Sequence, residues 1–297
     1  MLEKFLENIS VEVEPFALCL LDSGWRLSLP GPPVTMLHFA VRGEGGMISW
    51  DGGRIPFNAN CLAVVPGGVN HSLETRGIIK NELNIPCTPD GPPVHRIMAG
   101  DSGPLDMIVG CGTLRVRFGE ALGLFDHLTD IVIADLSSVP DAPGLFQSIL
   151  AEQSLLKDGS LVLQSAMMTQ LLIHFFRVIA DQSDAPIPWL AALEDQRLGR
   201  ALNKIMDDPG AHHTVESLAR EANMSRSAFA KHFSDAFDRS PMNLVNCVRL
   251  EQAARVLKNS QLSVDSVAGR FGFASRSHFS QAFKRHTGVS PAEYRRV

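Results

Sequence analysis

Two stretches near the C-terminal end of the chain, SRSAFAKHF at residues 225–233 and SRSHFSQAF at residues 275–283, repeat each other at an offset of 50 residues. Each copy is followed by a Ser-Pro pair at the same distance, Ser240-Pro241 in the first and Ser290-Pro291 in the second. The two stretches and the Ser-Pro pairs together give seven matching positions at this offset. A fixed internal period indicates one structural unit that occurs twice, and this duplicated unit decides the fold of the C-terminal third.

The repeated unit has the pattern of two short helices joined by a turn. Small Ala219 and Ala268 lie in the first helices, where they allow close helix crossing. Asn223 and Gly272 lie in the turns and tolerate the left-handed backbone conformation. Hydroxyl side chains that can cap a helix N-terminus precede both helices of both units: Thr214, Ser225, Ser263 and Ser275. The pattern predicts two helix-turn-helix units.

The second helix of each unit has one apolar and one polar face. Phe229 and Phe233, and likewise Phe279 and Phe283, are spaced i and i+4 and mark the buried side. Polar and cationic side chains on the other side are suited to base edges and phosphates in the major groove of DNA. We predict DNA contacts from nine residues: Arg226, Ser227, Lys231, His232, Arg276, Ser277, His278, Gln281 and Lys284.

A helix is expected between the two units, because Met242–Lys258 contains neither glycine nor proline. At about 1.5 Å per residue this linker helix is about 26 Å long. Such a spacer holds two recognition helices near the separation of successive major-groove faces, about 34 Å. The sequence therefore predicts an all-α DNA-binding domain over residues 198–297.

The rest of the chain differs in charge and in pattern. A chain of 297 residues exceeds one ordinary hydrophobic core, so two domains are expected. Residues 1–188 have a net charge of −10 and residues 189–297 one of +5, which together give the −5 of the whole chain. A basic C-terminal third is typical of a polyanion-binding domain. The segment QSDAPIPW, at 182–189, contains two prolines and predicts a linker over 183–197.

Short apolar segments separated by glycine and proline clusters dominate the first 140 residues and predict an antiparallel barrel or sandwich. Two helices are expected after it, at Leu145–Lys157 and Ser160–Ala180, around the break Asp158-Gly159. This places a β-rich domain at residues 1–182, with the barrel at about 1–140 and the helices at about 145–181. The predicted fold class is α+β.

The sequence predicts neither a secretory signal nor a membrane span. The N-terminus MLEKFLENIS lacks a basic region followed by an apolar run. Leu161–Ala180 is apolar, but it contains Gln164, Gln170, His174 and Arg177, which are costly in hydrocarbon. Five cysteines without a CxxC pair argue against a disulfide framework and a structural zinc site. We therefore expect a cytoplasmic protein.

Residues 198–297 resemble the DNA-binding domain of AraC/XylS-type transcriptional regulators. The resemblance is most specific in the second unit, which contains the family's motifs Gly272-Phe273, Ser277-x-Phe279, Phe283, Gly288, Ser290-Pro291 and Tyr294-Arg295. The linker helix matches at Arg249-Leu250 and Ala253-Ala254 and departs from the family at Leu244, Cys247 and Val248. The resemblance implies a sequence-specific DNA-binding regulator, more often an activator, that contacts RNA polymerase. It also implies a homodimer that pairs through the two helices of the N-terminal domain.

The N-terminal half is similar to the cupin-like sensor domain of a subgroup of this family. The matching segments are His38-Phe39, Pro66–His71, Cys111-Gly112, Glu152 and Gly159, whereas Ala59-Asn60 replaces the usual Gly-Asp pair. This resemblance implies that the domain binds a small effector at the barrel. Polar side chains on or beside the expected strands are the candidates to bind it: His38, Arg42, Trp50 and His71.

Two alternatives remain for the N-terminal half. A metal-dependent cupin enzyme requires about three converging ligands, but Ala40 stands where a second histidine should follow His38, and His71 has no clear partner. We therefore expect no catalysis, no cofactor and no metal. A thiol-based redox sensor is the other alternative, since four of the five cysteines lie in this half: Cys19, Cys61, Cys87 and Cys111.

Overall fold

The computed structural model describes residues 2–7, 9–85, 96–101, 103–118, 122–126, 128–155, 157–182 and 186–296. These residues form two compact units. The β-rich unit consists of Val11–Val116 and Phe125–Ser183, and the helical unit consists of Met1–Ser10, Arg117–Leu124 and Asp184–Val297. The helical unit therefore contains two segments from the N-terminal half. The bounds 1–182, 183–197 and 198–297 remain a prediction for independently folding domains.

The β-rich unit is built on two sheets. The larger sheet has the strand order β10-β2-β11-β4-β7-β13, with β1 and β12 also paired to β11, and the smaller sheet has the order β6-β5-β8-β3-β9. The strands are β1 (Ile9–Val13), β2 (Ala17–Asp22), β3 (Trp25–Leu29), β4 (Met36–Arg42), β5 (Met47–Trp50), β6 (Gly53–Pro56), β7 (Cys61–Val65), β8 (His71–Glu74), β9 (Asn81–Asn84), β10 (Arg96–Ala99), β11 (Leu105–Phe118), β12 (Leu122–Gly123) and β13 (Val132–Asp135).

One hydrophobic core fills the space between the two sheets. It combines Cys19 and Leu21 of the larger sheet with Leu27, Ile48 and Leu73 of the smaller sheet, all fully buried. The prediction of a β-rich N-terminal half is confirmed. The expectation of purely antiparallel pairing is wrong at two edges, because β10 pairs with β2 and β9 with β3 in parallel. Parallel pairing there is consistent with long connections between the partners rather than hairpins.

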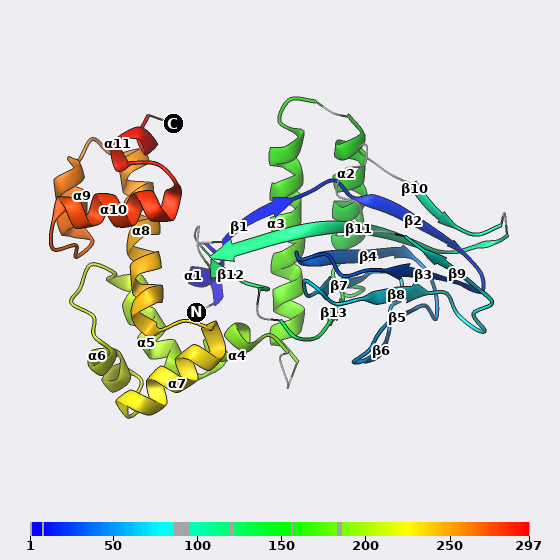
Figure 1. Cartoon of the computed structure of the whole chain (residues 1–297), viewed down its shortest axis with the longest axis horizontal. Helices are drawn as coiled ribbons and strands as arrows, with labels where there is room; N and C mark the ends of the chain where they lie inside the picture. Colours follow the sequence, from blue (N-terminus) through cyan, green and yellow to red (C-terminus); the bar gives the residue numbers. More distant parts are fainter. Residues whose placement is uncertain are drawn as a thin grey trace. The chain divides into compact units, whose positions relative to one another are not determined.

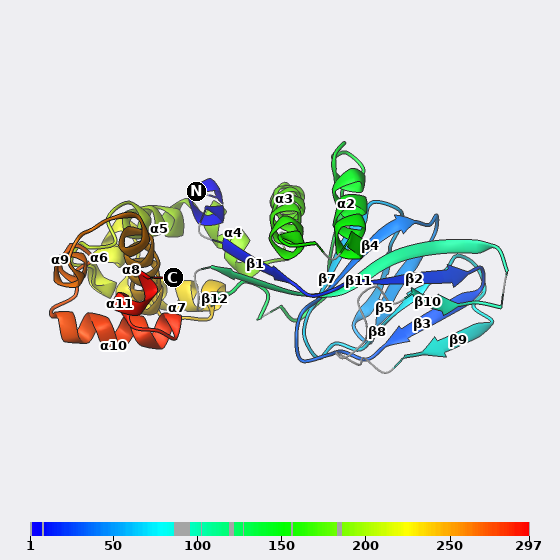
Figure 2. The ribbon, with the colours of Figure 1, turned by 90° about the horizontal axis from the view of Figure 1, so that it is seen from above.

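Two helices pack on the outer face of the larger sheet, α2 (Ala142–Leu155) and α3 (Ser160–Ala180), and Figure 2 shows them on one side of it. Phe146 of α2 stacks on Phe39 with ring centroids 4.4 Å apart. Gly110 allows this approach, because a Cβ atom at that position would lie 2.1 Å from the Phe146 ring. α2 begins at Ala142 rather than the predicted Leu145, since proline is well tolerated in the first turn of a helix.

The helix α3 confirms the predicted bounds Ser160–Ala180. By length and apolar composition it is the one helix among the described residues that qualifies as a candidate membrane span. One side of it is fully buried, including Leu171, Phe175 and Ile179. The N-terminal turn of α3 exposes apolar side chains instead, with Leu161, Val162 and Leu163 between 53% and 74% exposed.

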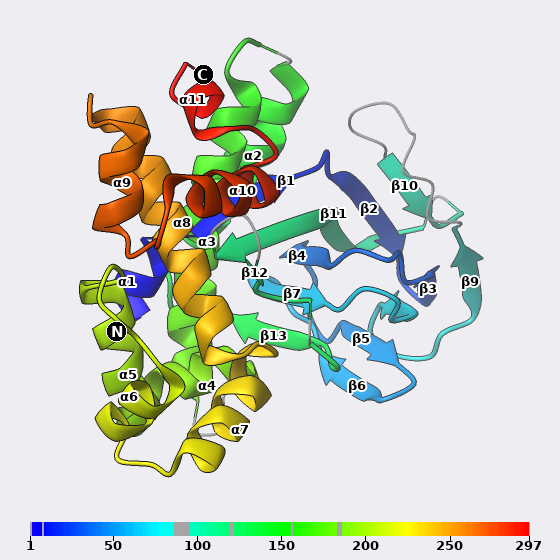
Figure 3. The ribbon, with the colours of Figure 1, turned by 60° about the vertical axis from the view of Figure 1, so that its left-hand side comes forward.

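The helical unit contains the two predicted helix-turn-helix pairs and the linker helix between them (Figures 1 and 3). Its helices are α1 (Leu2–Leu6), α4 (Pro188–Glu194), α5 (Gln196–Asp207), α6 (Val215–Glu221), α7 (Arg226–Phe237), α8 (Pro241–Asn259), α9 (Val264–Arg270), α10 (Arg276–Thr287) and α11 (Pro291–Tyr294). The linker helix α8 extends one residue beyond the predicted Met242–Lys258 at each end. Helix α4 lies inside the predicted linker, because Pro188 occupies the first helical position, where its missing amide hydrogen costs nothing.

Candidate functional site

The two helix-turn-helix units have the same local construction. The side chains of Thr214 and Ser225 accept hydrogen bonds from backbone amides at the N-termini of α6 and α7, and Ser263 and Ser275 do the same for α9 and α10. In the turns, Asn223 has φ of 52° and Gly272 has φ of 75°. The predicted caps and the left-handed turn residues are therefore confirmed.

Paired phenylalanines fix the inner face of each recognition helix. The ring centroids of Phe229 and Phe233 lie 5.6 Å apart on α7, and those of Phe279 and Phe283 lie 5.4 Å apart on α10. All four side chains are fully buried. Because residues three and four positions apart share one side of a helix, the opposite sides of α7 and α10 are turned to solvent.

The nine residues predicted to contact DNA are all exposed. On α7 two of the cations already have acidic partners. Arg226 Nη1 lies 3.0 Å from Glu216 Oε1, and Lys231 Nζ lies 2.8 Å from Asp235 Oδ2. The hydrogen bond from Lys231 to Asp235 raises the pKa of the lysine. With histidine neutral, the residues of α7 sum to a net charge of +1.

The second recognition helix has more free charge. Within the described part of the chain, no ion pair within 4.0 Å is found for Arg276, Lys284 or Arg285. With histidine neutral, the residues of α10 sum to a net charge of +3. Arg285 is exposed one turn beyond Gln281 and was not among the predicted contacts. Helical spacing could have found it, because Arg285 lies four residues after Gln281 and eight after Ser277, on the same side of the helix.

The linker helix is anchored by a partly buried arginine. Arg249 donates from Nε to the carbonyl oxygen of Pro209 at 2.7 Å and from Nη2 to that of Ala211 at 2.8 Å. Burial lowers its pKa. The three positions at which α8 departs from the family pattern are buried, at Leu244, Cys247 and Val248. These departures therefore concern the packing of the linker helix.

In the β-rich unit, a histidine pair joins the two sheets. His38 of β4 and His71 of β8 approach to 2.7 Å between their Nε2 atoms, and His71 Nδ1 donates to the carbonyl oxygen of Val69 at 3.0 Å. His38 must then donate from Nε2, which leaves its buried Nδ1 without a partner. Burial lowers the pKa of both histidines. The expectation that His71 has no clear partner is wrong, because the partner belongs to the opposite sheet.

Two cysteines of the larger sheet also lie side by side. The Sγ atoms of Cys19 and Cys111 are 3.1 Å apart in the core, and burial raises the pKa of Cys111. Burial raises the pKa of Cys61 as well. Cys87 lies outside the described residues. A search of the residues that the structure describes finds no group of three or more His, Cys, Asp or Glu side chains placed to hold a metal ion.

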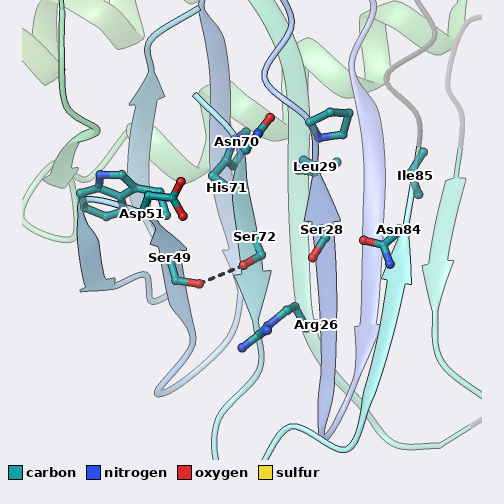
Figure 4. Close-up of a pocket in the computed structure, with 12 residues that line it drawn as sticks. Arg26, Ser28, Leu29, Ser49, Asp51, Asn70, His71, Ser72, Asn84 and Ile85 are labelled. Carbon is teal, nitrogen blue, oxygen red and sulfur yellow. Dashed lines mark hydrogen bonds between the residues drawn. The ribbon is translucent and has the colours of Figure 1, made fainter. Parts of the chain in front are cut away.

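A polar groove of about 600 Å³ lies on the smaller sheet (Figure 4). Ser49, Ser72, Ser28 and Asn84 are cross-strand neighbours on β5, β8, β3 and β9, and they form a row along its floor. Arg26 lies beside the middle of this row, two residues from Ser28 on β3, and pairs with the buried Glu74 at 2.9 Å. The groove therefore presents hydroxyl and amide groups, a cation that is already compensated, the carboxylate of Asp51 and apolar side chains such as Ile85.

The groove brings together two of the four predicted effector residues. Trp50 and His71 line it. His38 is fully buried and is connected to the groove through its hydrogen bond to His71. Arg42 is exposed at the end of β4 and does not line the groove.

Comparisons with known proteins find similarity to helix-turn-helix transcriptional regulators. A family model described as a helix-turn-helix domain matches residues 218–297. The chain is 30% identical to the RCS-specific HTH-type transcriptional activator RclR of Escherichia coli over 284 residues, which cover 93% of this chain and 90% of that protein. It is 27% identical to the HTH-type transcriptional regulator MtrA of Neisseria gonorrhoeae over 300 residues, covering 100% and 98%. A solved structure of the DNA-binding domain of AdpA with a target DNA matches 33% of this chain and 88% of that chain at 36% identity, with a TM-score of 0.32.

Proposed function

Because the chain belongs to the AraC family of DNA-binding transcriptional regulators, we propose that it controls promoters through base and phosphate contacts from α7 and α10. The observation that carries this proposal is the duplicated unit. Two capped helices expose polar and cationic side chains, while phenylalanine pairs hold their other sides in the core. The proposed contacts are the nine residues predicted from the sequence, together with Arg285. Activation, rather than repression, is proposed from the resemblance to the family.

Selection from a library of random DNA duplexes tests this function with the purified full-length protein. We expect enrichment of a site with two half-sites about one helical turn apart and an affinity that falls steeply with salt. Arg226→Ala and Arg276→Ala should weaken binding, whereas Arg115→Ala, an exposed arginine of the β-rich unit, serves as the control. Failure to enrich any sequence at moderate salt would contradict the proposal.

We propose that a small effector binds in the groove of the smaller sheet. The space between the sheets is filled by fully buried side chains such as Leu27, Ile48 and Leu73, which leaves the groove as the better candidate. Serine and asparagine side chains both donate and accept hydrogen bonds, and Arg26 is compensated by Glu74. Because the exposed carboxylate of Asp51 also lines the groove, the groove favours a hydroxyl-bearing molecule without negative charge that contacts Trp50 and His71. Arg42 remains a predicted contact without support from this groove.

A thermal-shift screen tests effector binding. A ligand at 100 times its dissociation constant stabilises the folded state by about 2.7 kcal/mol. Ser72→Trp, which fills the floor of the groove, should abolish the shift of any ligand that binds there. Ser148→Trp, on the exposed side of α2, should leave the shift unchanged. A ligand whose shift survives Ser72→Trp binds elsewhere and contradicts this location.

Assembly into a homodimer is proposed from the exposed apolar end of the α2–α3 pair. Leu155, Leu161, Val162 and Leu163 are each more than half exposed, and apolar clusters on a surface commonly mark interaction sites. Light scattering should report two chains per particle for the full-length protein, and Val162→Lys should shift it to one. A mass of one chain at high concentration, with and without DNA, contradicts dimerisation.

Other partners and the location of the protein are proposed from the same family membership. A promoter-bound activator would contact RNA polymerase, and a regulator of transcription would act in the cytoplasm. We also propose that the chain is not an enzyme, since its relatives are transcriptional regulators. A metal-dependent activity at His38 and His71 is the weaker alternative, and stoichiometric zinc or iron in the purified protein would favour it.

Thiol-based redox sensing is the second candidate function, and the proximity of Cys19 and Cys111 favours it. Oxidation by a peroxide or hypochlorite would form one S–S bond, release both thiol protons and transfer two electrons to the oxidant. Treatment with the oxidant, followed by peptide mapping, tests this reaction. If DNA binding changes with formation of the Cys19–Cys111 disulfide while no small molecule stabilises the protein, redox sensing replaces effector binding.

A further inference from the structure

Four aromatic rings from distant parts of the chain meet in the helical unit. Phe5 of α1 stacks on Phe118 at the end of β11, with ring centroids 4.3 Å apart, and on Trp189 of α4 at 5.0 Å. Phe5 also contacts Phe237, the last residue of the first recognition helix α7, at 6.5 Å. All four rings are at most 5% exposed. We call Phe5, Phe118, Trp189 and Phe237 the aromatic cluster.

Hydrogen bonds hold the same segments in place beside the aromatic cluster. Arg255 of the linker helix α8 donates from Nη2 to the carbonyl oxygen of Glu7 at 2.7 Å, directly after α1. The indole Nε1 of Trp189 donates to the carbonyl oxygen of Leu124 at 2.9 Å. Residues 2–7 and the segment after β11 are thus held to the helical unit by packing and by polar contacts.

The chain enters the aromatic cluster directly from the β-rich unit. β1 (Ile9–Val13) and β11 (Leu105–Phe118) each begin in one unit and end in the other, and they pair with each other. β11 contains Cys111 of the cysteine pair. Cys111 is the cross-strand partner of His38 on β4, so β11 also lies next to the histidine pair. β11 ends in Phe118 itself, and β1 begins four residues after Phe5.

The duplicated unit shows that the aromatic cluster is specific to the first recognition helix. At the 50-residue offset, Phe229 and Phe233 correspond to Phe279 and Phe283, but Phe237 corresponds to Thr287. The Thr287 hydroxyl donates to backbone carbonyls of its own unit, those of Phe283 and Val289. The additional phenylalanine of α7 is the residue that Phe5 contacts.

We propose that the aromatic cluster is a coupling surface, through which the N-terminal helix and the end of β11 position α7 while α10 is held independently of them. The DNA-binding part of this inference rests on the proposed function of α7 and α10. Its consequence is that the state of the β-rich unit alters the half-site read by α7 more than the half-site read by α10. In this proposal Phe5 and Phe118 pass on a change in the β-rich unit, and Trp189 and Phe237 receive it in the helical unit.

Hydroxyl-radical footprinting of the full-length protein on its selected DNA site tests the coupling. Arg226→Ala and Arg276→Ala first identify the half-sites of α7 and α10. Phe5→Ala should then weaken protection of the α7 half-site about tenfold, within the range typical of coupled sites, with the α10 half-site unchanged. Phe5→Leu, which replaces the ring with a smaller apolar side chain, should weaken the same protection to a lesser degree. Glu3→Ala, an exposed residue of the same helix α1, should leave the balance between the half-sites unchanged.

Amide hydrogen exchange keeps the inference testable if Phe5→Ala does not fold or if no DNA site is found. In the full-length Phe5→Leu protein without DNA, exchange should accelerate in α7 and stay unchanged in α10. Equal acceleration in both helices, or none in either, overturns the coupling, as does equal loss of both half-sites. A wild-type protein that binds no specific DNA overturns the proposed function alone, since the exchange measurement still decides the coupling.

Discussion

The two helix-turn-helix units share a scaffold and differ in what surrounds it. Each has hydroxyl caps, a left-handed turn residue and a buried phenylalanine pair. On the exposed side, the first unit pairs Arg226 with Glu216 and Lys231 with Asp235. The second unit has Arg285 at the position of Asp235. A duplicated fold can thus conserve its core and still give its two recognition helices different electrostatic strength.

The difference in charge and the aromatic cluster both indicate that the two recognition helices contribute differently to DNA binding. A helix whose cations are compensated gains little from phosphate attraction, so its contribution to DNA binding depends more on its position. The first recognition helix α7 is also the one that contacts Phe5 through Phe237. We infer that α10 provides the larger electrostatic share of the DNA affinity. The contribution of α7 depends on its position and therefore on the aromatic cluster.

Removal of a core phenylalanine should have the largest effect and the same effect in both units. Phe233→Ala and Phe283→Ala each empty a fully buried site, and such changes cost about 3–5 kcal/mol of stability. Urea unfolding of the two variants measures this cost. If one variant lost less than about 1 kcal/mol, far below the usual cost, the two cores would not be equivalent.

Alanine substitutions in the two turns should have an intermediate effect on stability, and the effect should differ between the units. Both Asn223 and Gly272 are left-handed, but a Cβ atom on Gly272 would lie 2.5 Å from the carbonyl oxygen of Gly210. Gly272→Ala therefore adds a backbone clash to the left-handed strain of about 1–2 kcal/mol, whereas Asn223→Ala adds the strain and removes two long side-chain hydrogen bonds of 3.3 Å, without a backbone clash. We expect Gly272→Ala to lower the unfolding free energy by more than Asn223→Ala does, measured by the same urea titration. Equal losses would mean that the second turn adjusts to the added methyl group.

Release of a paired cation should give the smallest change. Glu216→Gln frees Arg226, and an exposed ion pair is worth at most about 1 kcal/mol, so DNA affinity should rise a few-fold. Asp265→Asn is the matched control, because Asp265 has the same place in the first turn of α9 and no ion pair within 4.0 Å in the described structure. Fluorescence anisotropy with labelled duplex compares them. An equal gain from both variants would assign the effect to overall charge instead of the pair.

The sequence predicts the features of this comparison that depend on neighbouring residues. Caps, turns and phenylalanine spacing follow from residues within one or two helical turns, and all were found as expected. The His38–His71 contact and the packing of Phe5 on Phe118 join residues 33 and 113 positions apart in the sequence. Such contacts depend on how sheets and segments pack, and a hydrophobic pattern does not specify which partner a side chain meets. Helix α4 was missed because Pro186 and Pro188 indicate a linker as readily as the start of a helix.

The salt dependence of DNA affinity tests the central claim most directly. The full-length protein and two double variants, Arg276→Ala with Lys284→Ala and Arg226→Ala with Lys231→Ala, are titrated against the selected site over a range of salt concentrations. Each cation that neutralises a phosphate contributes about 1 to the slope of log affinity against log salt. The α10 variant should lower that slope by about 2, and the α7 variant by less than about 1. Equal reductions, or a larger reduction for the α7 variant, would contradict the assignment of the larger electrostatic share to α10.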